Sequence, residues 1–376
     1  MEQISTEVLV IGAGSAGLCA AYQAASAGAK VTVVDENSRP GGQLFKQIHK
    51  FFGSREHQAG KRGFIIGQEL LDKVQSAGAT VMLDSLVYAL LQDKSIGVIS
   101  NGTNYSVNAK KIIIATGAKE NYTAFPGSTL PGVMGAGAAQ TMININRVLP
   151  GQRILMIGSG NVGLIVSYQL MQAGAEVVAL VEGSSKIGGY GVHAAKIRRA
   201  GVPIYVNHTI KRVYGNDFVE KAEIIAVDEN WNTIPGSEKT FDVDTVCLAL
   251  GLNPMTELAW MAGCKFDFIK GFGGHVPLHD QNMESTVEGI YVAGDITGTE
   301  ESATAMDEGN LAGIAAAESL GYISHEKAAV LKEQIWHRLN SLRSGYFGAS
   351  RKSNKELQLS NMLIYKNSLK EETKHE

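Results

Sequence analysis

Cysteine is scarce in this chain of 376 residues: only Cys19, Cys247 and Cys264 are present, and no two of them form a C-x-x-C pair. This spacing excludes a local redox disulfide and a self-contained zinc or iron–sulfur set, because both need closely spaced cysteines. Cys19 falls in an expected helix and Cys247 in an apolar strand, so both are interpreted as buried small hydrophobic residues. We predict no metal site in this chain.

Long apolar runs and an excess of positive charge are also missing. No apolar run approaches the roughly 20 residues that span a bilayer, and the formal net charge of -3 gives no attraction for a polyanion. Neither a membrane span nor a nucleic-acid partner is therefore expected. The start Met1-Glu2-Gln3 enters a strand without the basic stretch and cleavage site of a signal peptide, which favours a cytoplasmic location.

The first 39 residues follow the order of a dinucleotide-binding unit. An apolar strand, Val8-Leu9-Val10-Ile11, runs into a glycine turn and an Ala-rich helix, and a second strand ends in acids about 20 residues later. In such a unit the first glycine makes the turn, the second lets backbone approach a pyrophosphate, and the third lets helix pack on strand. The helix N-terminus adds N–H groups and partial positive charge. The contacts expected here are Gly12, Gly14, Ser15, Ala16, Gly17, Asp35, Glu36 and Arg39.

A second unit repeats this plan, with its first glycine 146 positions after Gly12. The strand Ile154-Leu155-Met156-Ile157 leads into a glycine turn, a helix and a strand from Val177. Such a repeat makes two independent chance matches improbable and predicts a second adenine-nucleotide site. The contacts expected there are Gly158, Gly160, Asn161, Val162, Gly163 and Glu182.

The two units differ at one place in this alignment. A shift of 146 residues puts Val181 opposite Asp35 and Glu182 opposite Glu36. In one interpretation, Glu36 and Glu182 bind the ribose in the two units. In the other, which is favoured, Asp35 binds the ribose in the first unit and the second unit binds its ribose in a less usual way. An acid at this place disfavours NADP, whose 2′-phosphate it would repel.

Three further glycine-containing segments complete the pattern. Short β-rich stretches between about 80 and 115 predict a small antiparallel crossover. Apolar strands lead into Ala115-Thr116-Gly117, into Leu250-Gly251 and into Gly294-Asp295, the last followed by an Ala-rich helix from about Ser302. An acid at the end of such a strand lies where α/β sheets bind ligands; the alternative is a charge that complements the helix dipole.

The two units and these three segments, in their order along the chain, resemble the two-dinucleotide-binding flavoprotein superfamily that includes thioredoxin and glutathione reductases. The resemblance implies an α/β fold of two Rossmann-like domains, the second inserted in the first, with small antiparallel β crossovers. The implied parts are an FAD-binding domain in 1–119 and 256–323, an inserted NAD(H) or adenine-nucleotide domain in 120–255, and a C-terminal helical tail in 324–376. That tail is a candidate docking segment, and a frayed surface tail is the alternative.

The same resemblance implies roles for single residues. Gly12, Gly14 and Gly17 would meet the FAD pyrophosphate, and Asp295 would bond the ribityl chain. The helix from Ser302 would direct N–H groups at the flavin pyrimidine. The other contacts so implied are Gly42, Gln43, Ala115, Thr116, Gly117, Gly294 and Ala303, with Gly251 in the second domain.

Three other segments resemble a narrower group, the α subunits of heteromeric amine and amino-acid dehydrogenases: 125–134, 138–141 and 300–309. That group includes the corresponding subunits of sarcosine oxidase, opine oxidase, hydrogen cyanide synthase and dye-linked proline or hydroxyproline dehydrogenase. It implies an FAD-containing electron-transfer subunit whose partner is a flavin-containing, amine-oxidising β subunit, with an FMN at a subunit interface in some members. No cysteine follows Cys264, so a [2Fe-2S] cluster would sit on another small subunit.

Two alternatives remain open. The chain is a self-sufficient NADH-dependent FAD reductase, or its middle domain holds ADP or ATP as a structural or regulatory ligand, which the departure at Val181 mildly favours. No catalytic acid or base is predicted. His49 and His57, the histidines expected near the flavin, are interpreted as structural hydrogen-bonding residues.

Overall fold

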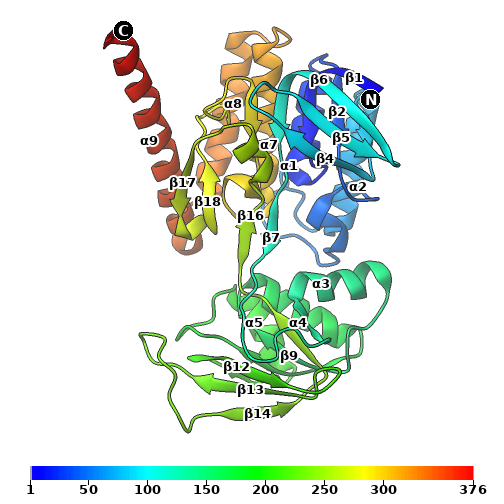
Figure 1. Ribbon diagram of the computed structural model, residues 1–376, viewed down its shortest axis with the longest axis vertical. Helices are drawn as coiled ribbons and strands as arrows, with labels where there is room; N and C mark the ends of the chain where they lie inside the picture. Colours follow the sequence, from blue (N-terminus) through cyan, green and yellow to red (C-terminus); the bar gives the residue numbers. More distant parts are fainter. Residues whose placement is uncertain (1, 376) are drawn as a thin grey trace. The chain divides into compact units, whose positions relative to one another are not determined.

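The computed structural model describes the backbone of residues 2–375 and the side chains of residues 2–371. The chain divides into two compact units: the first consists of Met1–Lys119 and Asn253–Glu376, and the second of Glu120–Leu252. The second unit is thus an insertion in the first (Figure 1). Its two connections, β7 (Ala118–Glu120) and β16 (Leu252–Pro254), pair as a two-stranded sheet.

The first unit is built on a seven-stranded sheet in the order β3-β2-β1-β6-β5-β4, with β19 also paired to β6. β1, β2, β3, β6 and β19 run parallel, so their carboxyl ends share one edge. The remaining pairs, β4 with β5 and β5 with β6, are antiparallel. The strands are β1 (Glu2–Ile11), β2 (Val31–Val34), β3 (Thr80–Met82), β4 (Ser85–Leu90), β5 (Ile96–Ser100), β6 (Thr103–Ile114) and β19 (Ile290–Val292).

The stretch between 80 and 115 differs from its predicted form. Thr80–Met82 is not part of an antiparallel crossover but pairs parallel with β2. The preceding helix, α2 (Gly63–Ser76), provides the crossover that a parallel connection needs. The antiparallel strands that follow extend the same sheet through the long strand β6.

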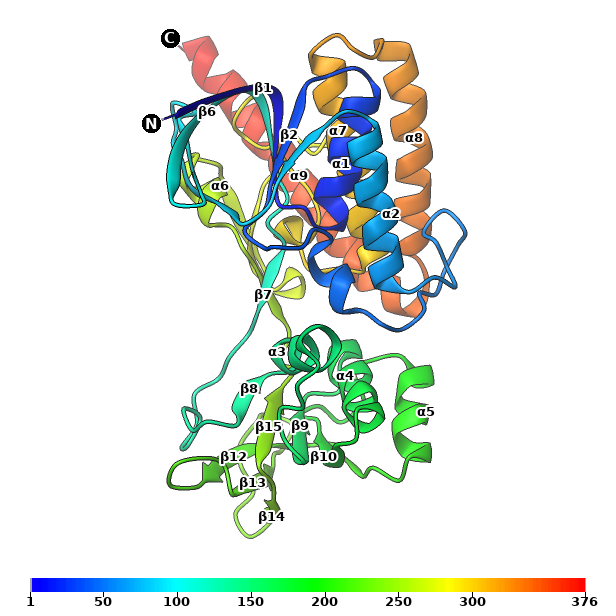
Figure 2. The same cartoon turned by 90° about the vertical axis from the view of Figure 1, so that its right-hand side faces the viewer.

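Four helices lie side by side on one face of this sheet (Figure 2). They are α1 (Ser15–Ser26), α2, α7 (Ser302–Ser319) and α8 (His325–Leu342). α1 and α7 approach closely because α7 presents glycine: a Cβ atom at Gly309 would lie 2.1 Å from the carbonyl oxygen of Ala16, and one at Gly313 would lie 2.3 Å from that of Ala20. This contact brings the start of α7 to the glycine turn that opens α1.

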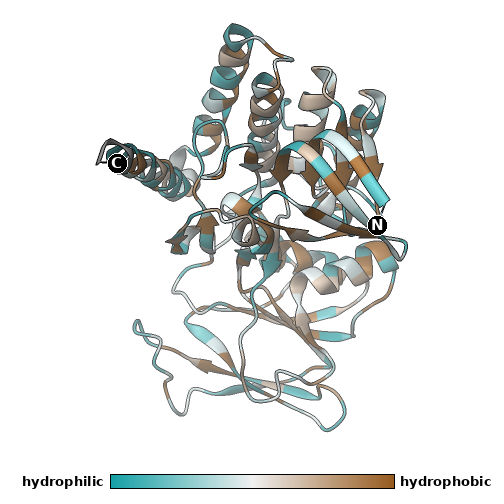
Figure 3. Ribbon diagram, turned by 45° about the horizontal axis from the view of Figure 1, so that its top comes forward, coloured by the Kyte–Doolittle hydropathy of each residue, from teal (hydrophilic) through white to brown (hydrophobic). Residues whose placement is uncertain are grey.

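Short elements and a long helix complete the first unit. Figure 3 shows hydrophobic colours on the strands of the main sheet, whereas α8 and α9 are largely hydrophilic. The lower part of α9 packs on β17 and η3 (Figure 1). The elements are η1 (Gly42–Lys46), α6 (Glu257–Met261), β17 (Phe266–Ile269), η3 (Lys270–Phe272), β18 (Gly274–Pro277), η4 (Asp295–Thr297) and α9 (Gly345–His375).

The second unit is a five-stranded parallel sheet in the order β11-β10-β9-β15-β8. Helices cover one face, and an antiparallel sheet of β12, β13 and β14 packs on the other through a separate apolar cluster. The strands are β8 (Val133–Gly135), β9 (Arg153–Ile157), β10 (Glu176–Val181), β11 (Ile204–Tyr205), β12 (His208–Tyr214), β13 (Lys221–Ala226), β14 (Lys239–Asp242) and β15 (Thr245–Leu248). The helices are α3 (Ala136–Thr141), the π-helix η2 (Met142–Asn146), α4 (Asn161–Gln172) and α5 (Gly191–Arg199).

The predicted α/β class with two Rossmann-like units is confirmed by this architecture. Cys19, Cys247 and Cys264 are all buried free thiols, as the sequence predicts for the first two. No helix among residues 2–375 is long and apolar enough to cross a membrane. The described side chains contain no group of three or more His, Cys, Asp or Glu that could hold a metal ion.

Candidate functional site

The glycine turn after β1 is shaped by close backbone contacts. Gly12 has φ +103°, and a Cβ atom there would lie 2.4 Å from the carbonyl oxygen of Ala115. A Cβ atom at Gly17 would lie 1.8 Å from the carbonyl oxygen of Gly12. The fold itself therefore requires these two glycines. At Gly14, by contrast, no described atom beyond its chain neighbours lies within 4 Å of the Cβ position, so this glycine faces open space.

That open space lies at the N-terminus of α1. Gly14 is the N-cap of this helix, and no side chain within residues 2–371 caps it. The first turn contains no acidic residue. Its N–H groups and the partial positive charge of the helix end are thus available to an anion. Gly42 borders the same space, since a Cβ atom there would lie 3.0 Å from the Cα atom of Gly14.

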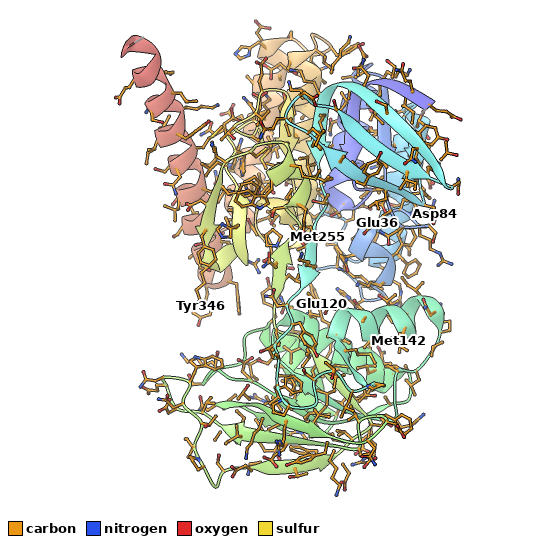
Figure 4. The ribbon with its side chains drawn as sticks, viewed as in Figure 1. Glu36, Asp84, Glu120, Met142, Met255 and Tyr346 are labelled. Carbon is orange, nitrogen blue, oxygen red and sulfur yellow. The ribbon has the colours of Figure 1, made fainter. Side chains whose placement is uncertain are left out.

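Asp35 organises this turn from the end of β2. Its Oδ2 accepts a hydrogen bond from the N–H of Ala13 at 2.6 Å, and its Oδ1 accepts from the N–H of Asn37 at 2.8 Å. Both carboxylate oxygens therefore serve the protein's own backbone. Glu36, the next residue, is exposed at the edge of the sheet (Figure 4). Asp35 and Glu36 both remain candidates for the acid that faces a ribose, because the bonds to Ala13 and Asn37 leave each oxygen of Asp35 with further acceptor capacity.

The second unit contains the same turn, displaced by one residue along β10. Val181 pairs with Ile157 as Val34 pairs with Ile11, because a β-bulge between Val177 and Ala179 accommodates one extra residue. Asp35 and Glu182 are therefore structural counterparts. The expected equivalence of Glu182 with Glu36, and of Val181 with Asp35, is wrong.

Hydrogen bonds repeat this equivalence. The Oε2 atom of Glu182 accepts from the N–H of Ser159 at 3.0 Å, and its Oε1 accepts from the N–H of Ser184 at 2.9 Å. These bonds match those of Asp35 to Ala13 and Asn37. The departure at Val181, which in the sequence favours a structural ADP or ATP, is thus a consequence of the bulge and carries no functional signal.

Gly160 in the second turn also faces open space. No described atom beyond its neighbours lies within 4 Å of its Cβ position, while a Cβ atom at Gly158 would lie 2.2 Å from the carbonyl oxygen of Ala249. The contacts of Gly12 and Gly14 are thus reproduced. Each unit offers one uncapped helix end behind one open glycine.

Asp295 lies three residues after the end of β19, at the start of η4, on the side of the first unit's sheet where the parallel strands end. Burial raises the pKa of this carboxyl, the backbone N–H of Glu300 lowers it, and the carboxylates of Glu308 and Glu300 raise it, which together give a pKa of about 7. The only hydrogen bond described for it comes from the N–H of Glu300, at 3.4 Å. A hydroxyl donor placed here would satisfy a carboxylate that the described chain leaves poorly solvated.

Ser302 begins α7, and its hydroxyl is an orphan. The Oγ atom is buried without a hydrogen-bond partner among the described residues. Nine in ten or more buried polar groups do have a partner, so such an atom calls for an explanation. Like the end of α1, this end of α7 has no side-chain cap within residues 2–371. The orphaned hydroxyl and the uncapped N–H groups form a polar cradle that fits a ligand with acceptor atoms.

Glu308 anchors α7 to the turn that contains Asp295. Its Oε2 accepts from the N–H of Gly294 at 3.1 Å and from the Oγ1 of Thr297 at 2.8 Å. Its Oε1 lies 2.6 Å from Nη2 of Arg343 and 3.1 Å from Nζ of Lys355. Burial alone would raise the pKa of Glu308, but the two cations outweigh it and hold the pKa well below its usual range.

Arg343 and Lys355 come from the C-terminal helical segment, and both are almost fully buried. Arg343 also binds Glu300 through Nε and Nη2, at 3.1 Å and 2.8 Å. Lys355 contacts Nε2 of His279 at 3.1 Å. The alternative of a frayed surface tail is therefore wrong, since this segment supplies two charges to the interior of the first unit.

A second charged group lies one residue earlier on α7. Asp307 accepts from Arg338 of α8, with Nη2 to Oδ1 at 2.6 Å, and lies 2.9 Å from Nε2 of His57. The Nδ1 atom of His57 lies 2.9 Å from Oγ of Ser54. Both ring nitrogens of His57 are thus engaged within the protein, in agreement with its predicted structural role. His49 stacks on Phe51, with ring centroids 5.7 Å apart.

The predicted contacts gather at one sheet edge within each unit. The Oγ1 of Thr116 donates a hydrogen bond to the carbonyl oxygen of Met255 at 2.6 Å. At the first edge, the segments that follow β1, β2, β6 and β19 in the chain contain Gly12, Gly14, Ser15, Ala16, Gly17, Asp35, Glu36, Arg39, Gly42, Gln43, Ala115, Thr116, Gly117, Gly294, Asp295, Ser302 and Ala303. The second contains Gly158, Gly160, Asn161, Val162, Gly163, Glu182 and Gly251.

Sequence reasoning missed the residues that support Asp295 and Ser302. Glu308 stood inside a segment of recognised resemblance but received no role. Arg343 and Lys355 carried no usable signal, because an isolated cation in a polar helix is normally solvated. His279, in a loop after β18, carried none either. Their burial is a product of tertiary packing alone.

Comparisons with known proteins agree with this geometry. A family model described as pyridine nucleotide-disulphide oxidoreductase matches residues 6–318. An opine oxidase subunit of Agrobacterium tumefaciens (strain Ach5) is 30% identical over 350 residues, which cover 86% of this chain and 67% of that protein. The alpha subunit of sarcosine oxidase from Corynebacterium sp. (strain P-1) is 25% identical over 329 residues, covering 85% of this chain and 33% of that protein.

A solved structure shows the same fold. The crystal structure of L-proline dehydrogenase from P. horikoshii matches with a TM-score of 0.67 at 22% identity, covering 89% of this chain and 59% of that one. The resemblance seen in the sequence motifs is confirmed by these matches. The chain spans about two thirds of the first relative and about one third of the second.

Proposed function

The chain belongs to the pyridine nucleotide-disulphide oxidoreductase family, and on this premise we propose that it is the FAD-containing electron-transfer subunit of a heteromeric amino-acid or secondary-amine dehydrogenase or oxidase. Membership makes the chain an oxidoreductase and implies binding of FAD and a pyridine nucleotide. The observation that carries the finer proposal is the match to subunits named for opine and sarcosine oxidation, which covers more than four fifths of the chain.

FAD is proposed to bind at the sheet edge of the first unit, which then comprises the predicted domain parts 1–119 and 256–323. The space at Gly14 and the helix end behind it would receive the pyrophosphate. Asp295 would accept hydrogen bonds from the ribityl hydroxyls, and Ser302 with the N-terminus of α7 would donate to the flavin ring. FAD held there supplies the acceptance and onward transfer of an electron pair.

The chain's own groups orient that cofactor. Glu308 holds the N–H of Gly294 and the hydroxyl of Thr297, and these fix the backbone on both sides of Asp295. Arg343 holds Glu300 and Glu308 together. A rigid edge of this kind supports a redox cofactor without a protein acid or base, because hydride transfer depends mainly on geometry.

The second unit, close to the predicted domain 120–255, is proposed to bind NAD(H). Its turn repeats that of the first unit, including the acid Glu182 and the open space at Gly160. A carboxylate at this place repels a 2′-phosphate, which favours NAD(H) over NADP(H). ADP or ATP share the same adenosine and phosphate groups and are the other ligands to be tested.

A flavin-containing, amine-oxidising β subunit is the proposed partner, and an interface FMN and a small [2Fe-2S] subunit belong to the same proposal. The support is that both curated relatives are named as subunits. α9 offers a surface for such a partner: Tyr346 is 85% exposed, and Leu363 and Ile364 are more than 60% exposed. Figure 4 shows Tyr346 at the foot of α9, pointing away from the first unit.

Affinity purification of the tagged chain from its native host tests this function. We expect recovery of a second flavoprotein, and dye reduction with sarcosine, proline, hydroxyproline or an opine only when that partner is present. Leu363→Glu with Ile364→Glu is expected to lose the partner, while Phe218→Glu in the second unit is a matched change of another exposed apolar residue. Robust amine oxidation by the isolated chain would contradict the proposal.

The self-sufficient NADH-dependent reductase remains the alternative, because the intact second turn suits NADH. Anaerobic addition of NADH to the purified chain, with flavin absorbance as the readout, separates the two functions. Rapid bleaching together with failure to recover any partner would favour the reductase. Slow or absent bleaching is expected from an electron-transfer subunit that receives its electrons from an amine-oxidising partner.

A further inference from the structure

Trp231 presents an aromatic ring at the tip of a fixed hairpin in the second unit. The residue is 61% exposed, and its backbone has φ +64°. The carboxylate of Asp228 stabilises this turn by accepting from the N–H groups of Asn230 at 2.9 Å and Asn232 at 2.8 Å. The N–H of Trp231 donates to the carbonyl oxygen of Asp228 at 3.0 Å. Hydrogen bonds therefore fix the turn whose backbone carries the ring.

The indole ring lies against Gly183. A Cβ atom at Gly183 would be 2.3 Å from Cη2 and 2.4 Å from Cζ3 of Trp231, so a side chain there would displace the ring. Gly183 is not among the residues with positive φ, so its backbone does not require glycine. The missing side chain at Gly183 therefore serves the contact with Trp231.

Backbone hydrogen bonds join the hairpin to the end of β10. The N–H of Val227 donates to the carbonyl oxygen of Asn207 at 2.8 Å, and the N–H of Asn207 donates to that of Ser184 at 3.1 Å. The N–H of His208 donates to the carbonyl oxygen of Glu182 at 3.0 Å. The indole thus has a fixed position beside the residues that follow Glu182.

The acid at the end of the second strand marks the ribose of the adenosine half of a nucleotide bound to such a unit. Adenine is bonded directly to that ribose, and Gly183 under the indole directly follows the acid, Glu182. Exposed aromatic rings bind nucleobases by stacking. We propose that Trp231 stacks on the adenine of the nucleotide in the second unit and so contributes to the affinity for that nucleotide. This inference rests on the nucleotide site proposed above.

Calorimetric titration of the FAD-containing chain with ADP and with NADH tests the role of Trp231. Trp231→Ala is expected to weaken both by about 5- to 150-fold, since stacking on an aromatic ring is worth about 1–3 kcal/mol per base and 1.4 kcal/mol is tenfold. Trp231→Phe keeps a ring and is expected to restore most of the affinity. Phe218→Ala removes another exposed ring of the second unit and is expected to change neither affinity.

Tryptophan fluorescence distinguishes stacking from a structural role of Trp231, because a structural role would not make the emission depend on bound adenine. Replacing Trp260 and Trp336 by phenylalanine leaves Trp231 as the only tryptophan of the sequence. Stacking predicts quenching by ADP and none by nicotinamide mononucleotide, which has no adenine. Equal ADP affinity in the wild type and Trp231→Ala would overturn the inference and leave the nucleotide site intact. No binding of ADP or NADH by the wild type would overturn the site itself, and the inference with it.

Discussion

Replacing Arg343 by methionine removes the cation shared by two buried carboxylates. Arg343 is 2% exposed and binds Glu300 and Glu308 through four donor–acceptor contacts of 2.6 to 3.1 Å. Lys355 remains beside Glu308, but nothing else described binds the side chain of Glu300. Removing one partner of a buried pair costs about 3 to 5 kcal/mol, because the other charge is left buried. We expect a loss of that size in the free energy of unfolding.

A matched arginine separates burial from charge. Arg351, on α9, contacts Glu301 at 3.1 Å, but this pair is partly exposed, with relative side-chain exposures of 27% and 43%. Arg351→Met is therefore expected to cost no more than about 1 kcal/mol. Urea denaturation followed by circular dichroism, with FAD at a fixed excess, measures both variants against the wild type.

Glu300→Gln in the Arg343→Met background tests the assigned cause. Neutralising the stranded carboxylate is expected to recover part of the loss, with a coupling of about 0.5 to 3 kcal/mol in the double-mutant cycle. A loss under about 1 kcal/mol for Arg343→Met, or no coupling to Glu300, would refute the claim that the C-terminal helices lock the edge of the first unit by charge.

Two further predictions concern pH. The pKa of Asp295, raised to about 7, means that the folded apoprotein prefers the neutral acid; its stability contribution is present below the ordinary pKa and is lost as pH rises through 7. In urea titrations, the Asp295→Asn apoprotein should therefore gain stability relative to the wild type as the pH rises from 5 to 8, and parallel stability profiles of the two proteins would contradict this. The variant should also bind FAD about 10- to 150-fold more weakly, because it loses charged hydrogen bonds worth about 1.5–3 kcal/mol. Burial and the charge of Lys355 lower the pKa of His279 to about 4, so its contribution is complete above the ordinary pKa of 6.5 and is lost as pH falls from there to 4. His279→Gln should reduce the loss of stability between pH 6.5 and pH 4 by about 3 kcal/mol. An unchanged loss of stability over this range would contradict the assignment of that loss to His279.

Local pattern predicts most of the nucleotide-binding edges. Strand, glycine turn, helix and acid are dictated by neighbouring residues, so Gly12, Gly14, Gly158 and Gly160 could be placed from the sequence. The equivalence of the acids could not, because the bulge in β10 shifts the register by one residue without any composition signal at Val178. A fixed spacing of 146 residues therefore aligned the wrong acids, whereas the strand pairing identifies the equivalent ones.

Long-range contacts explain what the sequence did not predict. The carboxylate of Asp35 accepts hydrogen bonds from backbone N–H groups that reach it only in the folded turn, and no local pattern predicts those bonds. Arg343 and Lys355 looked like surface charges of a polar segment. Their partners Glu300 and Glu308 lie 35 or more positions earlier, and such pairings cannot be read from local sequence. The proposed role of Trp231 likewise depends on its contact with Gly183, which precedes it by 48 positions.

The nucleotide contents of Gly14→Val and Gly160→Val test the central claim most directly. Both glycines have extended backbone conformations that valine adopts, and at each the Cβ position is clear of described atoms beyond the chain neighbours. Each variant should therefore fold and fill only the space meant for a pyrophosphate. We expect purified Gly14→Val to lack FAD while still binding NADH or ADP, and Gly160→Val to contain one FAD per chain while binding neither. Full FAD in a folded Gly14→Val chain would contradict the account of the first site.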